Sequence, residues 1–441
     1  MESFIMIKRS FFGLAKPRFE YDSAAGLPVK PEKISVPKKV TLFLRETCKC
    51  PSALVKCGDK VRTGQKLSLY EGSENYVISS VTGTVSEIYP YIGDFGKSYT
   101  AISVVTAAQE EPDNTFGEAA KAVSLDTAKN FLACAPGISC SGAFSDPAGT
   151  VKTVVVCGID KDLLMNTNSH IISSCPDDVK NGLVILKKIF AAGQAVVVSG
   201  KDMMKDLSVI GGASGVEMRL VGSEYPSAFP HQMMRNIFET PVPAGKSCKD
   251  LGFCFLSAEA AASVGRAFGT GQIPVTKTLT LIKKDLTTVI AEARIGTPVG
   301  DIFKACGVIT EDRDRIIIGG PLTGYAVYSE DYPVQPDTDA VMVQGSEAVS
   351  SVSDYPCINC GECVRICPAK VPVNMLVRFC ENAQYERAAE EYDLHSCIEC
   401  GLCSVVCVAK MPVFQYIRLA KYELARIAEK EAEKAKEEAD V

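Results

Sequence analysis

Two stretches toward the C-terminal end carry the residues best suited to chemistry. CINCGECVRICPAK at 357–370 and CIECGLCSVVCVAK at 397–410 each hold four cysteines in the spacing CxxCxxCxxxC. Thiolates bind iron, and three sulfurs from one tight CxxCxxC loop can hold three corners of a 4Fe-4S cubane, whose fourth ligand must come from elsewhere. The two stretches therefore predict two iron–sulfur clusters.

The fourth cysteine of each stretch is expected to serve the other cluster, as in two-cluster ferredoxins. Zinc is the competing interpretation, but a zinc ion needs only four ligands, so two complete runs fit two cubanes better. No nucleophile–base pair stands out in the chain, so we predict no catalytic residue. The first ligand set is Cys357, Cys360, Cys363 and Cys407, and the second ligand set is Cys397, Cys400, Cys403 and Cys367.

The cysteines outside the two motifs leave two interpretations open. Cysteine is among the most buried residue types, so scattered core thiols are the simpler one, and Cys380 between the motifs is read in this way. The alternative is a further cluster, which would raise the iron content from about eight to about twelve atoms per chain. Its candidate ligands are Cys48, Cys50, Cys134, Cys140, Cys157 and Cys175.

Composition bounds the class of protein. The chain has 441 residues, 46% of them hydrophobic and 23% charged, with a net charge of -6. These values are typical of a globular chain of about three domains and give no electrostatic reason to bind nucleic acid. No apolar run reaches the roughly 18 residues of a membrane-spanning helix, and the N-terminal segment lacks a signal-peptide pattern. We expect no transmembrane segment and a reducing cytoplasm, where the clustered CxxC spacing among the 19 cysteines indicates metal binding rather than disulfides.

The segments before the cysteine motifs must position them. Short strands punctuated by glycine follow residue 38, and from 124 to 275 apolar strands such as TVVVCGID alternate with helical stretches such as DDVKNGLVILKKIF. Strand–helix–strand order indicates a parallel sheet, whose ligands bind beyond the carboxyl ends of the strands. Asp160 and Asp162 follow the first of these strands, and we expect them to be solvated turn carboxylates.

Several segments resemble known modules. GDKVRTGQ and VTGTVSEI are similar to the barrel-sandwich hybrid of biotinyl and lipoyl carrier domains, but Gly72 stands where the modified lysine would be, so no carrier function is expected. TKTLTLIKKD, GTPVGDIFKACG and RDRIIIGGPLTG resemble the soluble-ligand-binding (SLBB) β-grasp module. The two cysteine motifs, separated by a helical insertion, resemble an α-helical ferredoxin domain. Together these segments resemble the C subunit of Rnf-type ion-translocating oxidoreductases.

The resemblance implies a multidomain α/β and α+β fold. In this family the subunit is peripheral, on the cytoplasmic side of the cell membrane, in a complex that exchanges electrons between ferredoxin and NAD while moving sodium ions or protons. The implied partners are ferredoxin and the other membrane and peripheral subunits. The implied units are an N-terminal arm (1–37), a barrel-sandwich hybrid (38–107), a Rossmann-like α/β domain resembling the complex I flavoprotein subunit (124–275), an SLBB β-grasp (276–330), a dicluster ferredoxin domain (345–425) and a charged C-terminal helix (426–441).

The nucleotide-binding segments of the family depart here. Members with FMN and an NADH site carry a GxGGxGFPxxxK loop, whereas this chain reads GISCSGAFSDPAG at 137–149. Cys140 and Ser141 replace glycines that let the backbone approach phosphate, and Asp146 and Pro147 stand where the lysine-bearing helix should continue. We therefore expect no FMN, no NAD, no independent NADH dehydrogenase activity, and an electron acceptor other than NAD. The alternatives are an NADH- or NAD-reactive FMN subunit and a structural scaffold with inert clusters.

Basic residues near the cysteine motifs offer a way to attract a partner. Arg365, Arg378, Arg418 and Lys421 are candidates to steer an acidic ferredoxin, while an ordinary solvated face is the alternative for each of them.

Overall fold

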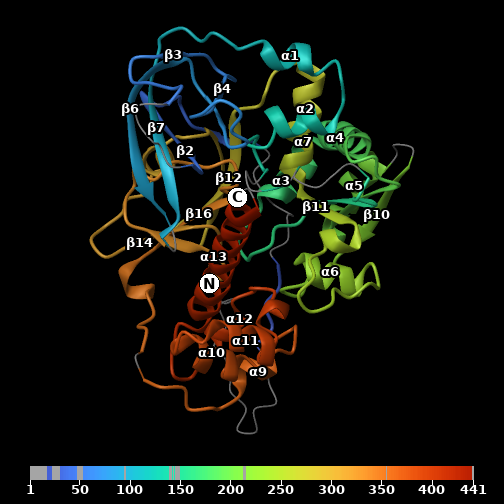
Figure 1. Cartoon of the computed structure of the whole chain (residues 1–441), viewed down its shortest axis with the longest axis vertical. Coiled ribbons are helices and arrows are strands. Elements are labelled where there is room, and N and C mark those ends of the chain that lie inside the picture. The colour runs from blue at the N-terminus through green and yellow to red at the C-terminus, as the bar shows by residue number, and fades with distance from the viewer. Residues whose placement is uncertain are drawn as a thin grey trace.

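The computed structural model describes residues 17–21, 30–46, 53–93, 96–138, 142, 144, 149–211, 215–353 and 355–439. Its strands form one six-stranded sheet, two four-stranded sheets and a two-stranded ribbon. In Figure 1 the blue strands of the first part and the green α/β unit lie on opposite sides, with the red cysteine-rich helices below them. Several predicted residues lie outside the described ones: Cys48, Cys50, Cys140, Ser141, Asp146 and Pro147.

The first unit is a small β structure with its own core. One four-stranded sheet has the order β2-β7-β6-β3, and β4 pairs with β5 beside it. Residues of β2 alternate between buried and less buried positions, which places Val40, Leu42 and Leu44 inside. The strands are β2 (Lys39–Leu44), β3 (Lys60–Val61), β4 (Lys66–Leu67), β5 (Val77–Ile78), β6 (Gly83–Ile92) and β7 (Ser98–Thr106).

The second unit is an α/β layer with a four-stranded parallel sheet, as the alternating pattern predicts. Its strand order is β10-β9-β8-β11, so the order reverses between β8 and β11. Helices α4 and α7 pack closely at Gly182 and Gly265 because neither residue has a Cβ. A Cβ at either position would overlap the backbone of the other helix. The strands are β8 (Thr153–Cys157), β9 (Gln194–Ser199), β10 (Val216–Leu220) and β11 (Phe253–Ser257); the helices are α1 (Thr115–Ala119), α2 (Leu125–Phe131), α3 (Thr167–Ser174), α4 (Pro176–Ile189), α5 (Met204–Gly211), α6 (Pro230–Asn236) and α7 (Ala258–Thr270).

The six-stranded sheet has the order β1-β13-β12-β16-β14-β15, with β12 and β16 parallel at its centre. It extends to Gln344, beyond residue 330, and it takes β1 (Glu32–Lys33) from the N-terminal arm. The segment between β15 and β16 is part of this core, since Val334 is fully buried. The remaining elements are β12 (Thr276–Ile282), β13 (Thr288–Arg294), α8 (Val299–Ala305), β14 (Arg315–Ile318), β15 (Tyr325–Val327) and β16 (Ala340–Gln344).

The cysteine-rich part is helical. The insertion between the motifs is a helical hairpin. The last helix begins at Val413, well before the charged segment expected at 426–441. It runs from the cysteine-rich helices toward the middle of the molecule (Figure 1). Among the described residues no helix is long and apolar enough to cross a membrane. The helices are α9 (Glu362–Ile366), α10 (Val373–Glu381), α11 (Tyr385–Tyr392), α12 (Leu402–Val405) and α13 (Val413–Ala439).

Candidate iron–sulfur site

The two cysteine motifs have the same backbone geometry. Gly361 and Gly401, which follow the second cysteine of each motif, both have φ of 74° and each precedes a short helix. Equivalent non-glycine positions are also left-handed: Asn359 and Glu399 at φ 58° and 57°, and the lysine that ends each motif. Non-glycine residues rarely adopt this conformation, so its repetition at matched positions shows that the two motifs follow the same tightly wound backbone path.

The first ligand set lines one small cavity. Cys357, Cys360 and Cys363 from the first motif and Cys407 from the second all face it. Its other walls are largely apolar and come from the segment after Cys407 and from α10, including Val377, Met411 and Val413. A 4Fe-4S cluster needs four thiolates around a dry space, which is the donor chemistry of this cavity.

The second ligand set lies deeper. Cys367, Cys400 and Cys403 are buried, whereas Cys360 of the first set is exposed. Burial raises the pKa of the Cys400 thiol to about 12, and its neighbours Cys397 and Cys367 add to the rise. Cys367 packs in one hydrophobic cluster with Cys403 and Cys397 of the other motif, as the exchange of fourth ligands requires.

These eight thiols are free of disulfides. In the part of the chain that the structure describes, no group of three or more His, Cys, Asp or Glu side chains is arranged to hold one metal ion. A cubane spreads its ligands over four iron corners, so the cysteines that hold it need not converge on one point. The ligand sets remain predictions, supported by the shared cavity and the repeated loop geometry.

The cysteines proposed for a further cluster have separate surroundings where they are described. The Cys134 thiol donates to the Tyr76 carbonyl oxygen at 3.0 Å, and Cys175 Sγ accepts from Arg266 Nη2 at 2.8 Å. Cys157 lies on β8, where burial raises its pKa to about 12. These contacts favour scattered thiols for Cys134, Cys157 and Cys175.

The loop of the second ligand set is anchored to other units. The Tyr225 hydroxyl, just before α6, donates to the Cys400 carbonyl oxygen at 2.6 Å. Lys421 Nζ on α13 donates to the Cys397 carbonyl oxygen at 2.6 Å and pairs with Glu399 at 2.9 Å. Lys421 therefore positions this loop, which is a different role from the steering of a partner that the sequence suggested for it.

The other basic candidates differ in their contacts. Arg365 pairs with Glu362 and donates to the Cys360 carbonyl oxygen at 3.2 Å, so it supports the first loop. The Arg418 guanidinium lies 5.5 Å from the centre of the Phe414 ring on the same helix. Arg378 is exposed on α10 and keeps the solvated character that the steering hypothesis needs.

The expectation that Asp160 and Asp162 are solvated is wrong, because their exposed fractions are 2% and 1%. Asp162 Oδ2 accepts from the backbone N–H groups of Leu322 and Thr323, at 3.0 and 2.7 Å, in the loop between β14 and β15. A Cβ added at Gly401 would overlap the Leu322 carbonyl oxygen. Asp162 thus holds the loop against which the second cysteine motif packs, a role that sequence reasoning missed.

A second buried carboxylate lies near the first. Asp160 accepts from the backbone N–H of Asn168 and from its Nδ2 at 2.9 Å. Burial raises the pKa of Asp160 to about 7, and Asp339 adds to the rise. Asp339 is also 2.9 Å from Nζ of the fully buried Lys277, which pairs with Glu259 as well. Buried charges are tolerated when paired in this way, so the network joins the α/β unit to the six-stranded sheet.

A cavity of about 680 Å³ lies at the carboxyl ends of β8 and β11, where the strand order reverses. We call it the switch-point cavity; Lys161, Lys249 and Arg418 bring positive charge to its wall. Parallel sheets bind ligands at such a point, so its place agrees with the sequence prediction. Much of the loop expected to decide nucleotide binding, namely residues 139–141, 143 and 145–148, lies outside the described residues.

Comparison with known proteins shows which proteins this chain is similar to. Residues 18–109 match the family model described as the RnfC barrel sandwich hybrid domain. The C subunit of the ion-translocating oxidoreductase complex of Klebsiella pneumoniae is 25% identical over 394 residues. The C subunit of the proton-translocating ferredoxin:NAD(+) oxidoreductase complex of Clostridium ljungdahlii is 26% identical, with 88% of each chain covered. Together the matches support an RnfC-type subunit. The predicted barrel-sandwich hybrid is confirmed with it.

The length of the match differs between these relatives. The chain spans about half the length of several curated relatives, including 52% of the Klebsiella protein. It covers 86% of the C subunit of the Na(+)-translocating ferredoxin:NAD(+) oxidoreductase complex of Acetobacterium woodii. A chain in the crystal structure of the NAD+-reducing [NiFe]-hydrogenase in the H2-reduced state is a weak structural neighbour, with a TM-score of 0.43 and 13% identity over 71% of this chain and 63% of that one.

Proposed function

We propose that this RnfC-type chain is a peripheral electron-transfer subunit of a membrane-bound, ion-translocating complex, on the cytoplasmic side of the cell membrane. It takes electrons from ferredoxin and passes them to membrane partners, with an acceptor other than NAD. The observation that carries the proposal is the pairing of two equivalent cysteine loops: Cys407 lines the cavity of the first loop, and Cys367 packs in one cluster with Cys403 and Cys397 of the second. That arrangement suits two neighbouring 4Fe-4S clusters.

The two clusters, when bound, would supply one-electron transfer at two adjacent points. The residues of the chain give these points different surroundings. The first ligand set opens to solvent at Cys360, where a soluble partner can approach. The second is packed between α12, α13 and the α/β unit, and Tyr225 and Lys421 fix two of its carbonyl groups. A fixed, dry environment limits reorganisation during electron transfer.

Iron content and redox titration test this proposal. Chain purified without oxygen should contain about eight iron atoms and show two one-electron centres by electron paramagnetic resonance. Reduced ferredoxin should reduce both of them. Cys380→Ala is the matched control, because this buried thiol lies outside both ligand sets and its loss should leave the iron content unchanged. Iron content near zero, or clusters that ferredoxin cannot reduce, would overturn the proposal.

A second candidate is an FMN-containing subunit that reacts with NADH or NAD. The switch-point cavity favours it, since its volume and place suit a nucleotide-like cofactor. The same purified chain separates the two candidates. Bound FMN, seen as flavin absorbance, or saturable oxidation of NADH would establish the second candidate. Either result would also contradict the claim of the first candidate that the electron acceptor is not NAD.

A further inference from the structure

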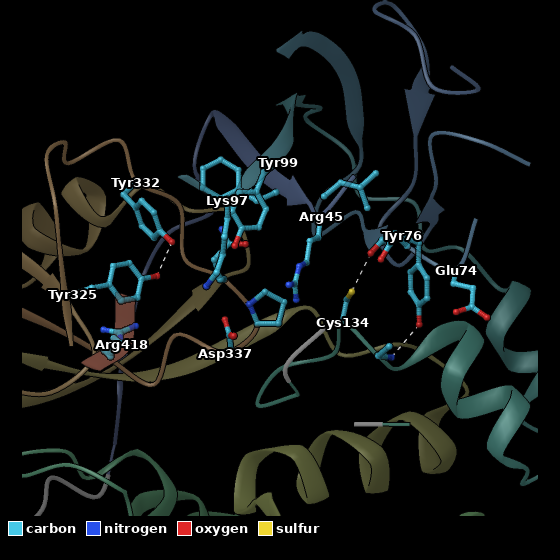
Figure 2. Close-up of a pocket in the computed structure, with 16 residues that line it drawn as sticks. Arg45, Glu74, Tyr76, Lys97, Tyr99, Cys134, Tyr325, Tyr332, Asp337 and Arg418 are labelled. Atoms are coloured by element: carbon cyan, nitrogen blue, oxygen red, sulfur yellow. Dashed lines mark hydrogen bonds between the residues drawn. The ribbon is translucent and has the colours of Figure 1, made fainter. Parts of the chain in front are cut away.

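The outermost strands of the sheets differ in how far other parts of the chain cover them. The edge strand β2 is covered, because the Thr41 N–H donates to the Gly296 carbonyl oxygen at 3.0 Å. The Phe43 ring centre on the same strand lies 5.7 Å from that of Tyr332. Figure 2 shows this junction, where Tyr332 and Tyr99 of the neighbouring strand β7 line the same cavity. This edge is therefore occupied within the chain.

Strand β10 forms one edge of the parallel sheet and is far more exposed. Four of its five residues are exposed, whereas β11, at the opposite edge, alternates between half-buried and buried positions. Among the described residues β10 pairs with β9 alone, and in Figure 1 it lies on the side of the α/β unit that faces away from the barrel strands. An uncovered edge strand presents backbone groups with which another strand can pair.

The backbone of β10 turns alternate residues outward. The N–H of Val221, directly after the strand, donates to the Ser199 carbonyl oxygen of β9 at 3.0 Å. Backbone groups of successive strand residues point to opposite sides, so those of Met218 and Leu220 point away from β9. The Met218 side chain packs against Gly211 of α5, yet Met218 is 46% exposed and Leu220 is 36% exposed. A further strand at this edge would therefore meet outward-pointing backbone groups beside an apolar margin.

The sequence of β10 is self-complementary. It reads VEMRL at 216–220, with apolar residues at both ends and at the centre and one acidic and one basic residue between them. In an antiparallel pair of two such strands centred on Met218, each Glu217 lies opposite the Arg219 of the other copy. Val216 then lies opposite Leu220. Opposite charges in directly opposed positions stabilise a strand pair, whereas charges of a single sign would repel a second copy.

We propose that two copies of this chain associate in solution through β10, antiparallel about Met218, so that two four-stranded sheets join into one continuous sheet. Glu217 then exchanges the Arg219 of its own strand, 2.6 Å away, for the Arg219 of the other copy. Met204 of α5, 54% exposed, lies two helical turns from Gly211 on the same face of the helix and widens the apolar margin. This association is independent of the electron-transfer role proposed above.

Sedimentation velocity of the iron-loaded full chain, prepared without oxygen at micromolar to submillimolar concentrations, tests the association. The parent chain should shift from monomer to dimer as the concentration rises. Glu217→Arg places two basic residues opposite each other, and the symmetry repeats this contact, so the variant should weaken dimerisation by at least about tenfold. The double variant Glu217→Arg with Arg219→Glu restores opposite charges at both contacts and should return the dimer to within about threefold of the parent. Both variants change exposed side chains and should melt with the parent.

Glu391→Arg is the matched control, because Glu391 is also an exposed carboxylate that pairs with an arginine, Arg387, at 2.9 Å, and it lies on α11 outside the α/β unit. Its dimerisation should equal that of the parent. A parent chain that stays monomeric at all these concentrations overturns the proposal. A dimer that Glu217→Arg leaves intact, or that the double variant fails to restore, overturns it as well, because the association would then use another surface. Equal weakening in Glu391→Arg would trace the effect to net charge and would also overturn it.

Discussion

The two cysteine loops have nearly the same sequence pattern and backbone but very different surroundings. The loop of the first ligand set borders solvent, with Cys360 exposed and Ile358 62% exposed. The loop of the second is enclosed, with Cys400 at 7% and Leu402 at 4% in a cluster with Tyr225 and Phe229 of the α/β unit. Local ligand geometry is thus repeated, while the tertiary contacts give one site access and the other rigidity.

The largest effect is expected from replacing one cysteine of either ligand set by serine. Cys367→Ser and Cys407→Ser should each lower the iron content from about eight to about four atoms, because a cubane that loses a thiolate ligand is released. With exchanged ligands, Cys367→Ser leaves the exposed cluster and Cys407→Ser leaves the enclosed one. A chelator should therefore remove the remaining iron several-fold faster from Cys367→Ser, measured by iron release without oxygen.

The opposite order of chelation rates would show that each motif completes its own cluster. Cys380→Ala again serves as the control, since it removes a buried thiol without touching either set. Equal rates of iron release in the two cysteine variants would contradict the proposed difference in solvent access between the two clusters.

The next effect concerns the glycines at matched positions, Gly361 and Gly401. Alanine at either one must adopt a left-handed conformation, which costs about 1–2 kcal/mol. At Gly361 the nearest atom to an added Cβ is Arg365 Nη1 at 3.7 Å, so Gly361→Ala should cost no more than that. At Gly401 the Cβ also meets the Leu322 carbonyl oxygen, so Gly401→Ala should lower the free energy of unfolding further and release the iron of the second set. Urea denaturation with iron analysis measures both.

Gly361→Ala is itself the control for Gly401→Ala, because the two share φ and motif position. Equal losses of stability would mean that the Leu322 loop moves to make room for the added Cβ at little cost, and that the enclosed site is not rigidly held.

Residue spacing predicted the two loops because ligand geometry is local, and hydrophobic patterning predicted the parallel sheet around β8 because each of its strands is continuous in sequence. The support behind the second loop was missed because it depends on contacts between distant residues. Asp162 meets the loop at Leu322 and Thr323 across about 160 positions, and nothing next to Asp162 in the sequence indicates that a loop covers it. For the same reason the expected β-grasp unit ended at residue 330, before β16. This strand joins the sheet by pairing with β12 and β14, which are distant from it in the sequence.

The smallest effect is a pH dependence confined to the enclosed side. The pKa of Asp160 rises from 3.8 to about 7 through burial and the nearby Asp339, so between these values the folded chain holds a proton that the unfolded chain has released. The stability this group contributes is therefore full at low pH and lost as the pH rises through about 7. Asp160→Asn keeps an oxygen for the Asn168 N–H and removes the titration. The variant should lose less unfolding free energy than the parent between about pH 5 and pH 8, measured by urea denaturation.

Asp301, partly exposed and 3.6 Å from Lys304, supplies the control: Asp301→Asn should leave the pH dependence of the parent unchanged. An unaltered pH dependence in Asp160→Asn would show that Asp160 is ionised in the folded chain at neutral pH. If raising the pH also speeds chelation of the enclosed iron but not of the exposed iron, and Asp160→Asn abolishes that difference, then the carboxylates beyond β8 help to hold the second cysteine loop. Equal acceleration at both sites would instead trace the pH effect to the cysteine ligands themselves.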